Sequence, residues 1–498
     1  MGLTRHFSCT RTGSTARSIP VPMQRAEFDV IVAGGGTAGA IAAIAAARAG
    51  ARTCLVDAAG HLGGTCFALA NITPFHNSRG QPVVGGLAQE LVERIATRGG
   101  AREKIHLPNP AGIGGSFTPV DPDAMKLALF EMAEGAELWL HTVLVDTLSV
   151  DGRVAGVRVH NKSGMHELRA KVVVDATGDA DVAVRAGAAH VQDTPEAALN
   201  ATLLFRVAGV DTDAFIADAR RTPDKFVLLA DPYLREIKKL APADVMREVR
   251  DIYDCPYIYL ANLVRDYVPR ADWDEWEITD ADKSGWGRLK PFAARFSIMP
   301  LPHRRDIVTL NATSITFDAT DGAQRSRAEV EGQRQMRIVL EVLQRYIPGF
   351  SACFLHAVMP AVSIRASRRI VGEYELTRDD VERGARFPDA IARGAYPMSV
   401  QSASQPGMRQ HLFVRDGGDY DIPYRCLVPR DIDGLLVAGR CLAATREAIG
   451  SARMGAQCMA YGQAAGTAAA LAAARGIAPR AIDIAALRRA LQAERAIV

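Results

Sequence analysis

The stretch FDVIVAGGGTAGA, residues 28–40, decides the fold. Its first six residues form an apolar, β-rich run, and the glycines after them lead into an Ala- and Ile-rich segment that extends to about Gly50. This order predicts a strand, a glycine turn and a helix. A second apolar run, residues 53–56, ends on Asp57, 18 positions after Gly39. The spacing is typical of a βαβ unit that binds a dinucleotide.

Each part of this unit has a physical task. Gly34 allows the tight turn, Gly36 lets the backbone approach a pyrophosphate, and Gly39 lets the helix pack on the strand. The pyrophosphate is expected at the helix N-terminus, where N–H groups and the helix dipole favour negative charge. Asp57 is the expected acceptor for ribose hydroxyls, and its charge disfavours a 2′-phosphate.

The composition indicates a globular protein without a dominant charge. The chain has 498 residues, 48% of them apolar, and its 59 Lys and Arg nearly balance its 56 Asp and Glu. This length predicts two domains or one large interrupted domain. Because no basic field dominates the chain, nucleic acid is not an expected partner.

The eight cysteines are scattered, and no two of them form a CxxC pair. This pattern argues against a structural zinc site, an iron–sulfur cluster and a disulfide framework, so we predict no metal site. A reducing, cytoplasmic location fits this cysteine usage best.

Two uncharged stretches, residues 30–47 and 454–474, reach the length of a membrane span. Both are rich in Ala and Gly, and the second contains Gln457 and Gln463, which are costly in lipid. We therefore expect two helices buried inside the protein, and no membrane as a partner.

Residues 1–26 are expected to be a disordered extension outside the fold. Several arginines precede the first acid, Glu27, and superficially resemble those of a transit peptide. The segment lacks a continuous apolar core and contains Pro20 and Pro22. These features favour a disordered extension, or an alternative start at Met23.

Patterns farther along the chain predict helices, an antiparallel meander and a return to the first sheet. Helices are expected at residues 83–97 and 121–135, and the meander within residues 137–174, with turns at Asp151-Gly152 and at residues 162–164. In the mixed middle part we expect strands at residues 203–207, 307–310 and 354–358, a helix at residues 323–346, then a strand at 434–440 and a helix at 453–475.

Seven further motifs accompany the first one. They are LGGT (62–65), VGGLAQEL (84–91), VVDATGDAD (173–181), RRIVGEY (368–374), IPYR (422–425), GLLVAGRC (434–441) and GQAAGTAAAL (462–471). Together the motifs resemble the FAD-dependent oxidoreductase family of the glutathione-reductase-like flavoprotein superfamily. Fumarate reductase and succinate dehydrogenase flavoproteins are more distantly similar.

The resemblance implies an α/β fold with two parts. One is a Rossmann-like FAD-binding domain with a three-layer ββα arrangement, and it is interrupted by a mixed α+β substrate or cap domain. The implied boundaries are residues 27–196 and 425–476 for the FAD-binding domain, 197–424 for the substrate domain and 477–498 for a C-terminal helix.

The resemblance also implies that the bound dinucleotide is FAD. The first turn and helix would hold the pyrophosphate, Asp57 the ribose, and the Val143 backbone the adenine. The start of the last long helix would lie beside the pyrimidine ring, where its dipole stabilises negative charge on a reduced flavin. The implied FAD-binding residues are Gly34, Gly36, Thr37, Ala38, Gly39, Asp57, Gly64, Thr65, Val143, Ala176, Thr177, Gly178, Gly439, Arg440, Met454, Gly455 and Gln457.

The chain departs from the family pattern at two positions. Arg446 stands where relatives usually have a histidine, so a role for that histidine in proton transfer is in doubt. Gly455 stands near a position where relatives are expected to have a proline, which would loosen the turn.

Arg365, Arg368, Arg369 and Glu373 form the densest charged group in the middle of the chain. In one interpretation Glu373 pairs with one of these arginines, and the others are solvated or bind the protein's own backbone. In the other, Arg365 binds a substrate carboxylate, because a planar guanidinium suits bidentate binding.

Proton transfer needs a group that titrates near neutral pH, which favours histidine. The candidates are His303, His76, His356, His411 and Tyr424, and we choose His303 before His76. Cys66 follows Gly-Gly-Thr as a redox cysteine does, but position 71 is Asn71, so no local dithiol forms. Cys66 is then a packing residue, or a thiol that faces or anchors the flavin.

These features predict an FAD enzyme that exchanges a hydride between flavin N5 and a small organic substrate. If the substrate carries a carboxylate, Arg365 is the residue expected to bind it. Two alternatives stay open: a flavin-dependent monooxygenase that uses NAD(P)H and O2, and the flavoprotein subunit of an electron-transfer complex. A small-molecule substrate is the expected partner, and the sequence leaves a homo-oligomer open.

Overall fold

The computed structural model describes most of the chain. The described residues are 24–64, 70–108, 115–195, 199–223, 226–228, 244, 249–254, 258–260, 267–281, 287–289, 297–401 and 409–498. The predictions for Thr65 and Cys66, and for residues 1–23 of the expected extension, lie outside this part of the chain.

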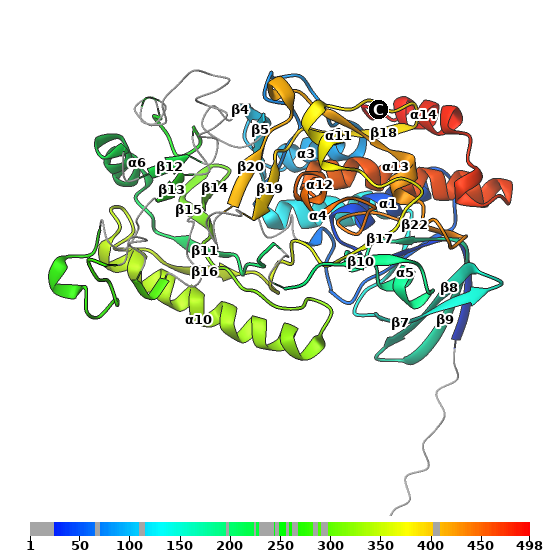
Figure 1. The fold of residues 1–498 in the computed structure, drawn as a ribbon, viewed down its shortest axis with the longest axis horizontal. Coiled ribbons are helices and arrows are strands. Elements are labelled where there is room, and N and C mark those ends of the chain that lie inside the picture. The colour runs from blue at the N-terminus through cyan, green and yellow to red at the C-terminus, as the bar shows by residue number, and fades with distance from the viewer. Residues whose placement is uncertain are drawn as a thin grey trace, which may run out of the picture.

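A seven-stranded sheet carries the glycine-rich turn (Figure 1). Its strands are β6 (Glu137–Trp139), β2 (Thr53–Val56), β1 (Gln24–Ala33), β9 (Gly164–Asp175), β8 (Arg153–Asn161), β7 (Val143–Val150) and β22 (Leu435–Val437). The pairs β6–β2, β2–β1, β1–β9 and β9–β22 are parallel, whereas β9–β8 and β8–β7 are antiparallel. Strand β9 therefore joins a Rossmann-like parallel sheet to the predicted meander.

The turn between β7 and β8 shows why the meander forms where the sequence predicts it. Asp151 and Gly152 have φ angles of 49° and 74°. Two consecutive positive φ angles define the type of two-residue turn whose twist matches a hairpin, and Asp-Gly favours it. The predicted turn is confirmed.

Two helices of small residues pack against each other beside the sheet. Helix α1 (Thr37–Arg48) lies on α13 (Gly455–Arg475), and both contact β1. An added Cβ at Gly466 would lie 2.0 Å from the Ala42 carbonyl oxygen, so this contact requires glycine. The expectation of two buried helices is confirmed. None of the helices in the described part of the chain has the length and apolar character needed to cross a bilayer.

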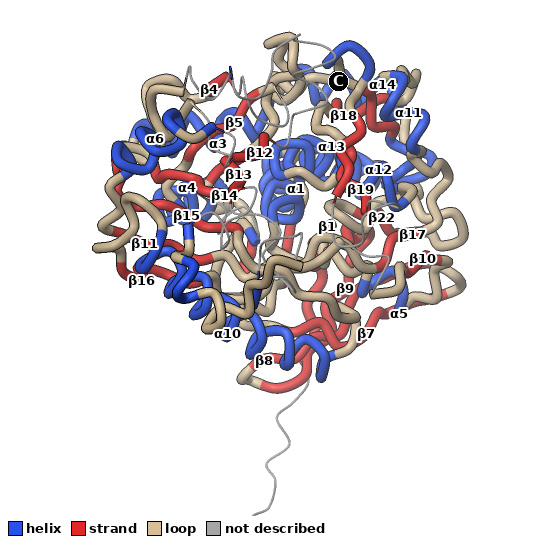
Figure 2. Tube along the Cα trace, turned by 60° about the vertical axis from the view of Figure 1, so that its left-hand side comes forward, coloured by secondary structure: helices blue, strands red, loops and turns tan. Residues whose placement is uncertain are grey.

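A second, antiparallel sheet lies at the other end of the molecule, with a long helix along it (Figures 1 and 2). Its strand order is β14 (Ser297–Leu301), β15 (Arg304–Asn311), β11 (Phe205–Ala208) and β16 (Phe354–Val358). Helix α10 (Gly322–Tyr346) begins after Asp321, whose side chain accepts a hydrogen bond from the Gln324 amide. Buried side chains of this helix and this sheet share a second hydrophobic core.

Shorter elements complete the fold. The helices are α3 (Gly86–Thr97), α4 (Pro122–Met132), α5 (Asp181–Arg185), α6 (Thr212–Arg221), α11 (Arg378–Arg383), α12 (Arg446–Ala452) and α14 (Ile484–Ala493). Strands β3 (Asn71–Ile72), β5 (Ser116–Pro119) and β4 (Leu107–Pro108) form a small three-stranded sheet in that order. The two-stranded sheets are β10 (His190–Gln192) with β17 (Arg368–Ile370), β12 (Phe226–Leu228) with β13 (Ile258–Leu260), β18 (Ala390–Gly394) with β21 (Tyr420–Pro423), and β19 (Met398–Gln401) with β20 (Arg409–Leu412).

The structure corrects three expected boundaries. Strand β1 begins at Gln24, because residues 24–26 pair with His166–Leu168 of β9, so these residues are not part of a disordered extension. The helix expected at residues 453–475 is α13, which begins two residues later, at Gly455, and follows the separate helix α12, which ends at Ala452. C-terminal residues 484–493 form a helix, whereas the expected helix spanned 477–498.

The expected division between the two domains also differs from the observed cores. Ile370, Leu376, Ile391 and Tyr420 belong to the core of the first sheet, although they lie within the expected substrate domain, residues 197–424. The reason is that β17 pairs with β10 and β18 packs on α13, which returns this segment to the first core. Phe117 lies before that domain in sequence but packs in the second core.

Candidate functional site

The glycine turn after β1 lies against the end of β2, the 61–64 loop and the loop after β9. Gly34 has a φ of +103°, and its amide donates to the Val56 carbonyl at 2.7 Å. An added Cβ at Gly39 would lie 1.8 Å from the Gly34 carbonyl oxygen, so Gly39 has the close-packing position that the motif predicts. At Gly36, by contrast, an added Cβ would meet no atom within 4 Å, because this glycine faces open space.

The open space beyond Gly36 is a natural place for an anion. Helix α1 starts at Thr37, and its N-cap residue, Gly36, offers no side-chain acceptor to the first amides. Thr37 Oγ1 instead donates to the Gly63 carbonyl at 3.1 Å, which holds the 61–64 loop against the turn. Helix N-termini with uncapped amides attract phosphate groups.

Asp57 fixes the end of β2 beside this turn. One carboxylate oxygen accepts a hydrogen bond from the Gly35 amide, and the other accepts from the Ala59 amide at 2.6 Å. The Thr142 amide donates to the Asp57 carbonyl at 2.9 Å. This bond places Val143, the next residue and the first of β7, beside the end of β2. The expected ribose and adenine residues are therefore neighbours in space.

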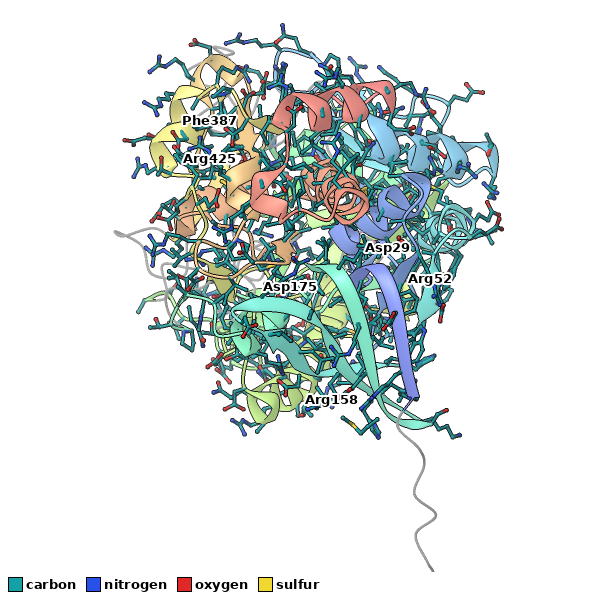
Figure 3. The ribbon with its side chains drawn as sticks, turned by 90° about the vertical axis from the view of Figure 1, so that its right-hand side faces the viewer. Asp29, Arg52, Arg158, Asp175, Phe387 and Arg425 are labelled. Carbon is teal, nitrogen blue, oxygen red and sulfur yellow. The ribbon has the colours of Figure 1, made fainter. Side chains whose placement is uncertain are left out.

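The loop after β9 forms the opposite wall. Asp175 is fully buried at the carboxyl end of β9 (Figure 3), where it accepts hydrogen bonds from Thr177 Oγ1 at 2.7 Å and from the Ala183 amide at 3.0 Å. Burial raises the pKa of the Asp175 carboxyl. Its hydrogen bonds fix the shape of the Ala176–Thr177–Gly178 turn.

Arg440, after β22, is tied to the same loop. Its Nη1 lies 2.7 Å from Asp179 Oδ1 and 2.6 Å from Ser367 Oγ. Burial opposes the charge of Asp179, but the positive charge of Arg440 and its hydrogen bond hold the pKa of that carboxyl below its usual value. Arg440 thus links the two parallel strands to the segment that carries Arg365.

Arg365 reaches the same region from the second sheet. One guanidinium nitrogen donates to the Asn200 carbonyl, and Nη2 donates to Asn311 Oδ1 at 3.2 Å. The two other arginines of the charged group have other tasks. Arg369 binds Asp193 bidentately, at 2.6 and 3.1 Å, and Arg368 binds Asp181 at 2.5 Å. Glu373 pairs with Arg480 at 3.0 Å, which corrects the partner expected for it in the first interpretation. The other part of that interpretation is confirmed, since all three arginines also donate to backbone carbonyls.

Arg453, between α12 and α13, is a site residue that the sequence reasoning missed. Its Nε is buried and has no hydrogen-bond partner in the described part of the chain. Burial lowers the pKa of Arg453 to about 10. The sequence feature that could have identified this residue is that Arg453 is the single charged residue within residues 448–474. A buried, unpartnered donor on a charged group of this kind points to a ligand.

These walls enclose one cavity of about 300 Å³. The predicted residues that line it are Gly34, Gly36, Thr37, Ala38, Asp57, Gly64, Ala176, Thr177, Gly178, Arg365, Gly439, Arg440, Met454 and Gly455. The space at Gly36, the unpartnered Arg453 Nε and the start of α13, whose N-cap Met454 has no side-chain bond, all fit an elongated anionic dinucleotide.

Three expected cofactor residues lie outside this lining. Gly39 packs α1 on β1, as described above. Val143 is 52% exposed on β7. Gln457 is fully buried in the first turn of α13, where its Nε2 lies 3.2 Å from Tyr420 Oη and 3.3 Å from the Ser451 carbonyl. Gln457 therefore supports the helix start from behind.

The structure does not bring the expected proton-transfer residues into this lining. His303 lies on the exposed turn between β14 and β15, and its Nε2 lies 2.8 Å from the Ala101 carbonyl. Tyr424 is buried and donates to the Pro479 carbonyl at 2.9 Å. His76 is half-buried, and burial lowers the pKa of its imidazole.

The segment that carries His76 contacts the start of α13. Three residues before His76, the Thr73 carbonyl accepts a hydrogen bond from the Ala456 amide at the start of α13, at 3.3 Å. The ring centroid of His76 lies 5.3 Å from that of His106, and the His106 ring is stacked on Phe75. His106 was not a candidate in the sequence.

Comparison with known protein families matches residues 29–491 to the model of a family described as FAD dependent oxidoreductase. The match spans both sheets and all the motifs quoted above. FAD is the cofactor of this family.

Individual relatives are similar over only part of their length. Digeranylgeranylglycerophospholipid reductase 2 of Methanopyrus kandleri is 32% identical over 160 residues, 30% of this chain and 38% of that protein. Thiamine thiazole synthase of Aeropyrum pernix is 32% identical over 169 residues, 32% of this chain and 57% of that protein. The chain thus spans about 40 to 60% of the length of these relatives.

Among solved structures, a geranylgeranyl bacteriochlorophyll reductase-like protein of Thermoplasma acidophilum is similar over most of its length. The alignment covers 95% of this chain and 85% of that one, with a TM-score of 0.47 and 12% identity.

Proposed function

Because the chain belongs to the family of FAD-dependent oxidoreductases, we propose that it is a dehydrogenase, oxidase or reductase for a small organic acid that Arg365 binds. FAD supplies the redox chemistry, a hydride exchange at N5 of its ring system. The observation that carries the proposal is that the Arg365 guanidinium, anchored on the second sheet, lines the same cavity as the glycine turn.

The chain's own residues divide the work of binding the cofactor. The start of α1 and the open space at Gly36 receive the pyrophosphate, and Asp57 receives the ribose. Arg453 and the start of α13 provide positive potential, which stabilises negative charge that develops during reduction.

Arg365 supplies substrate recognition. Its hydrogen bonds to Asn200 and Asn311 go to uncharged oxygens and fix the guanidinium plane. A fixed plane suits the bidentate binding of a carboxylate, and a partly buried site strengthens that bond.

We propose His76 rather than His303 as the group that accepts the substrate's proton. Burial lowers the pKa of His76, so the imidazole is neutral at physiological pH and able to accept a proton. His303 lies on an exposed turn, and its bond to the Ala101 carbonyl engages one ring nitrogen.

The test is an anaerobic screen in which organic acids are mixed with the FAD-loaded protein and flavin bleaching is followed. Each acid is paired with its amide, and an isoprenoid lipid is included because of the similarity to the Methanopyrus reductase. The proposal expects that an acid bleaches the flavin and that its amide does not.

Arg365→Met should raise KM for that acid about 100-fold or more, the effect of losing a charge-assisted bidentate bond of roughly 3 kcal/mol. Arg334→Met, an exposed arginine on α10, is the control and should leave KM unchanged. An unchanged KM in Arg365→Met would remove this residue from the substrate site.

A further inference from the structure

A second cavity, of about 450 Å³, shares no lining residue with the cofactor cavity. Its volume falls within the range of about 300 to 1,000 Å³ that is usual for ligand pockets. Four segments that are distant in sequence form its wall: the loop after β3, the end of α11 with the residues after it, β18, and the turn before β21. Together they contribute five arginines, which are Arg79, Arg383, Arg386, Arg393 and Arg415.

Carboxylates orient three of these arginines. Arg386 Nη1 lies 2.6 Å from Asp419 Oδ1 and 2.8 Å from Asp421 Oδ1. Arg383 Nη2 lies 2.8 Å from Asp380 Oδ1, and Arg79 Nη2 lies 3.8 Å from Asp416 Oδ2. Of these acids Asp416 and Asp419 line the cavity, so its described lining holds five arginines and two carboxylates.

The other two arginines have donors that the protein leaves unused. Arg393 approaches its acids only at long range, with Nη1 4.0 Å from Asp419 Oδ1 and Nε 3.9 Å from Asp421 Oδ1. Its Nε is buried and has no hydrogen-bond partner among the described residues. Arg415 is exposed, and within the described part of the chain its side chain has no acidic partner.

We propose that this cavity is a second ligand site, which binds the phosphate groups of a small organic phosphate. Guanidinium groups that converge from several directions suit an anion with several oxygens and more than one charge, whereas a single carboxylate needs only one of them. Among the described residues, the wall contains no aromatic side chain. Stacking on a base, as in single-stranded nucleic acid binding, therefore has no support in this wall, and the anionic group is the part that is recognised.

The site is independent of the proposed redox function, because neither Arg365 nor Arg453 takes part in it. FAD content and flavin absorption therefore report whether a variant is folded without reporting on this cavity.

The test is a calorimetric titration of inorganic pyrophosphate into the FAD-loaded protein at low ionic strength. The proposal expects saturable binding that weakens as salt is added, and that sulfate competes poorly. Arg393→Met and Arg415→Met should each weaken pyrophosphate binding tenfold or more with normal FAD content, while Arg334→Met on α10 leaves it unchanged.

The proposal is overturned if pyrophosphate does not bind at millimolar concentration, or if it binds equally well to both variants and to the wild type. Equal affinity for sulfate also overturns it, because it indicates only a general attraction of anions. Titration with ADP separates the possible sources of the phosphate. Tighter binding of ADP than of pyrophosphate identifies an organic diphosphate, and the reverse order identifies the free anion.

Discussion

Arg440 Nη1 lies 2.7 Å from Asp179 Oδ1, and this ion pair joins the loops that follow two adjacent parallel strands, β22 and β9. The Asp179 carboxylate is almost fully buried. A buried carboxylate depends on its partners, since its desolvation is costly.

Arg440→Met should therefore destabilise the FAD-free protein by roughly 3 kcal/mol, because it leaves Asp179 buried with fewer partners. The double variant Arg440→Met/Asp179→Asn should regain part of this loss. Urea unfolding of Arg440→Met, Asp179→Asn, the double variant and the wild type measures the coupling. Strictly additive effects would show that the two residues are energetically independent.

The two glycines of the turn should respond in opposite ways to substitution by alanine. Gly36→Ala places a methyl group in open space, so the FAD-free protein should keep its Tm. FAD affinity should fall about tenfold or more, a loss of about 1.4 kcal/mol or more, because the methyl occupies the phosphate cradle.

Gly39→Ala is the matched comparison, because its Cβ would lie 1.8 Å from the Gly34 carbonyl oxygen. This variant should lose folded structure with or without FAD. Circular dichroism and FAD fluorescence titration measure both effects. Unchanged FAD affinity in Gly36→Ala would place the cofactor elsewhere.

Arg453→Met should raise the stability of the FAD-free protein while it weakens FAD binding. The Arg453 Nε is buried without a partner, so removal of the charge should stabilise the fold by roughly 1–3 kcal/mol. In the loaded protein that charge assists an anionic cofactor, and FAD affinity should fall about tenfold.

Arg446→Met, a half-exposed arginine on the neighbouring helix α12, is the control and should change neither quantity much. A parallel loss of stability and of FAD affinity in Arg453→Met would indicate a structural role only.

His106 should make stability depend on pH between 6.5 and 4. Burial, aided by the positive charge of His76, lowers the pKa of His106 to about 4 from its usual 6.5. Between these values the unfolded chain binds the proton and the folded one does not, so stability falls as the pH falls.

The loss from pH 7 to pH 5 should be roughly 1–2 kcal/mol. Urea unfolding at both pH values measures this loss. The His106→Gln variant should lose less stability between pH 7 and pH 5, because it lacks the contribution of the His106 imidazole. An identical pH dependence in the variant would show that His106 titrates normally in the folded protein.

Local sequence patterns predicted those parts of the fold whose backbone conformation depends on a few neighbouring residues. The β1–α1 turn and the Asp151-Gly152 hairpin each need only a few consecutive residues of a particular type. Strand β16 was predicted with its observed bounds, 354–358, from its apolar run.

Features that depend on distant contacts were not visible in the sequence. The segment from Ile370 to Tyr424 returns to the first core because β17 pairs with β10 and β18 packs on α13, contacts that no local pattern indicates. Arg453 was missed for a related reason, since its burial comes from the surrounding cavity rather than from its neighbours in sequence.

The predicted cofactor residues were found more reliably than the predicted catalytic ones. Glycines and small residues that surround a dinucleotide occur at fixed spacing after strands, and most of them line one cavity. Histidines have no such spacing, and neither His303 nor His76 lines that cavity.

FAD binding is best measured by the absorption spectrum of the purified protein, repeated on supernatant and pellet after acid precipitation. We expect one FAD per chain, released into the supernatant, and a Gly36→Ala protein that is folded but takes up FAD poorly. A folded wild-type protein that shows no flavin spectrum, even after FAD is added, would contradict this expectation.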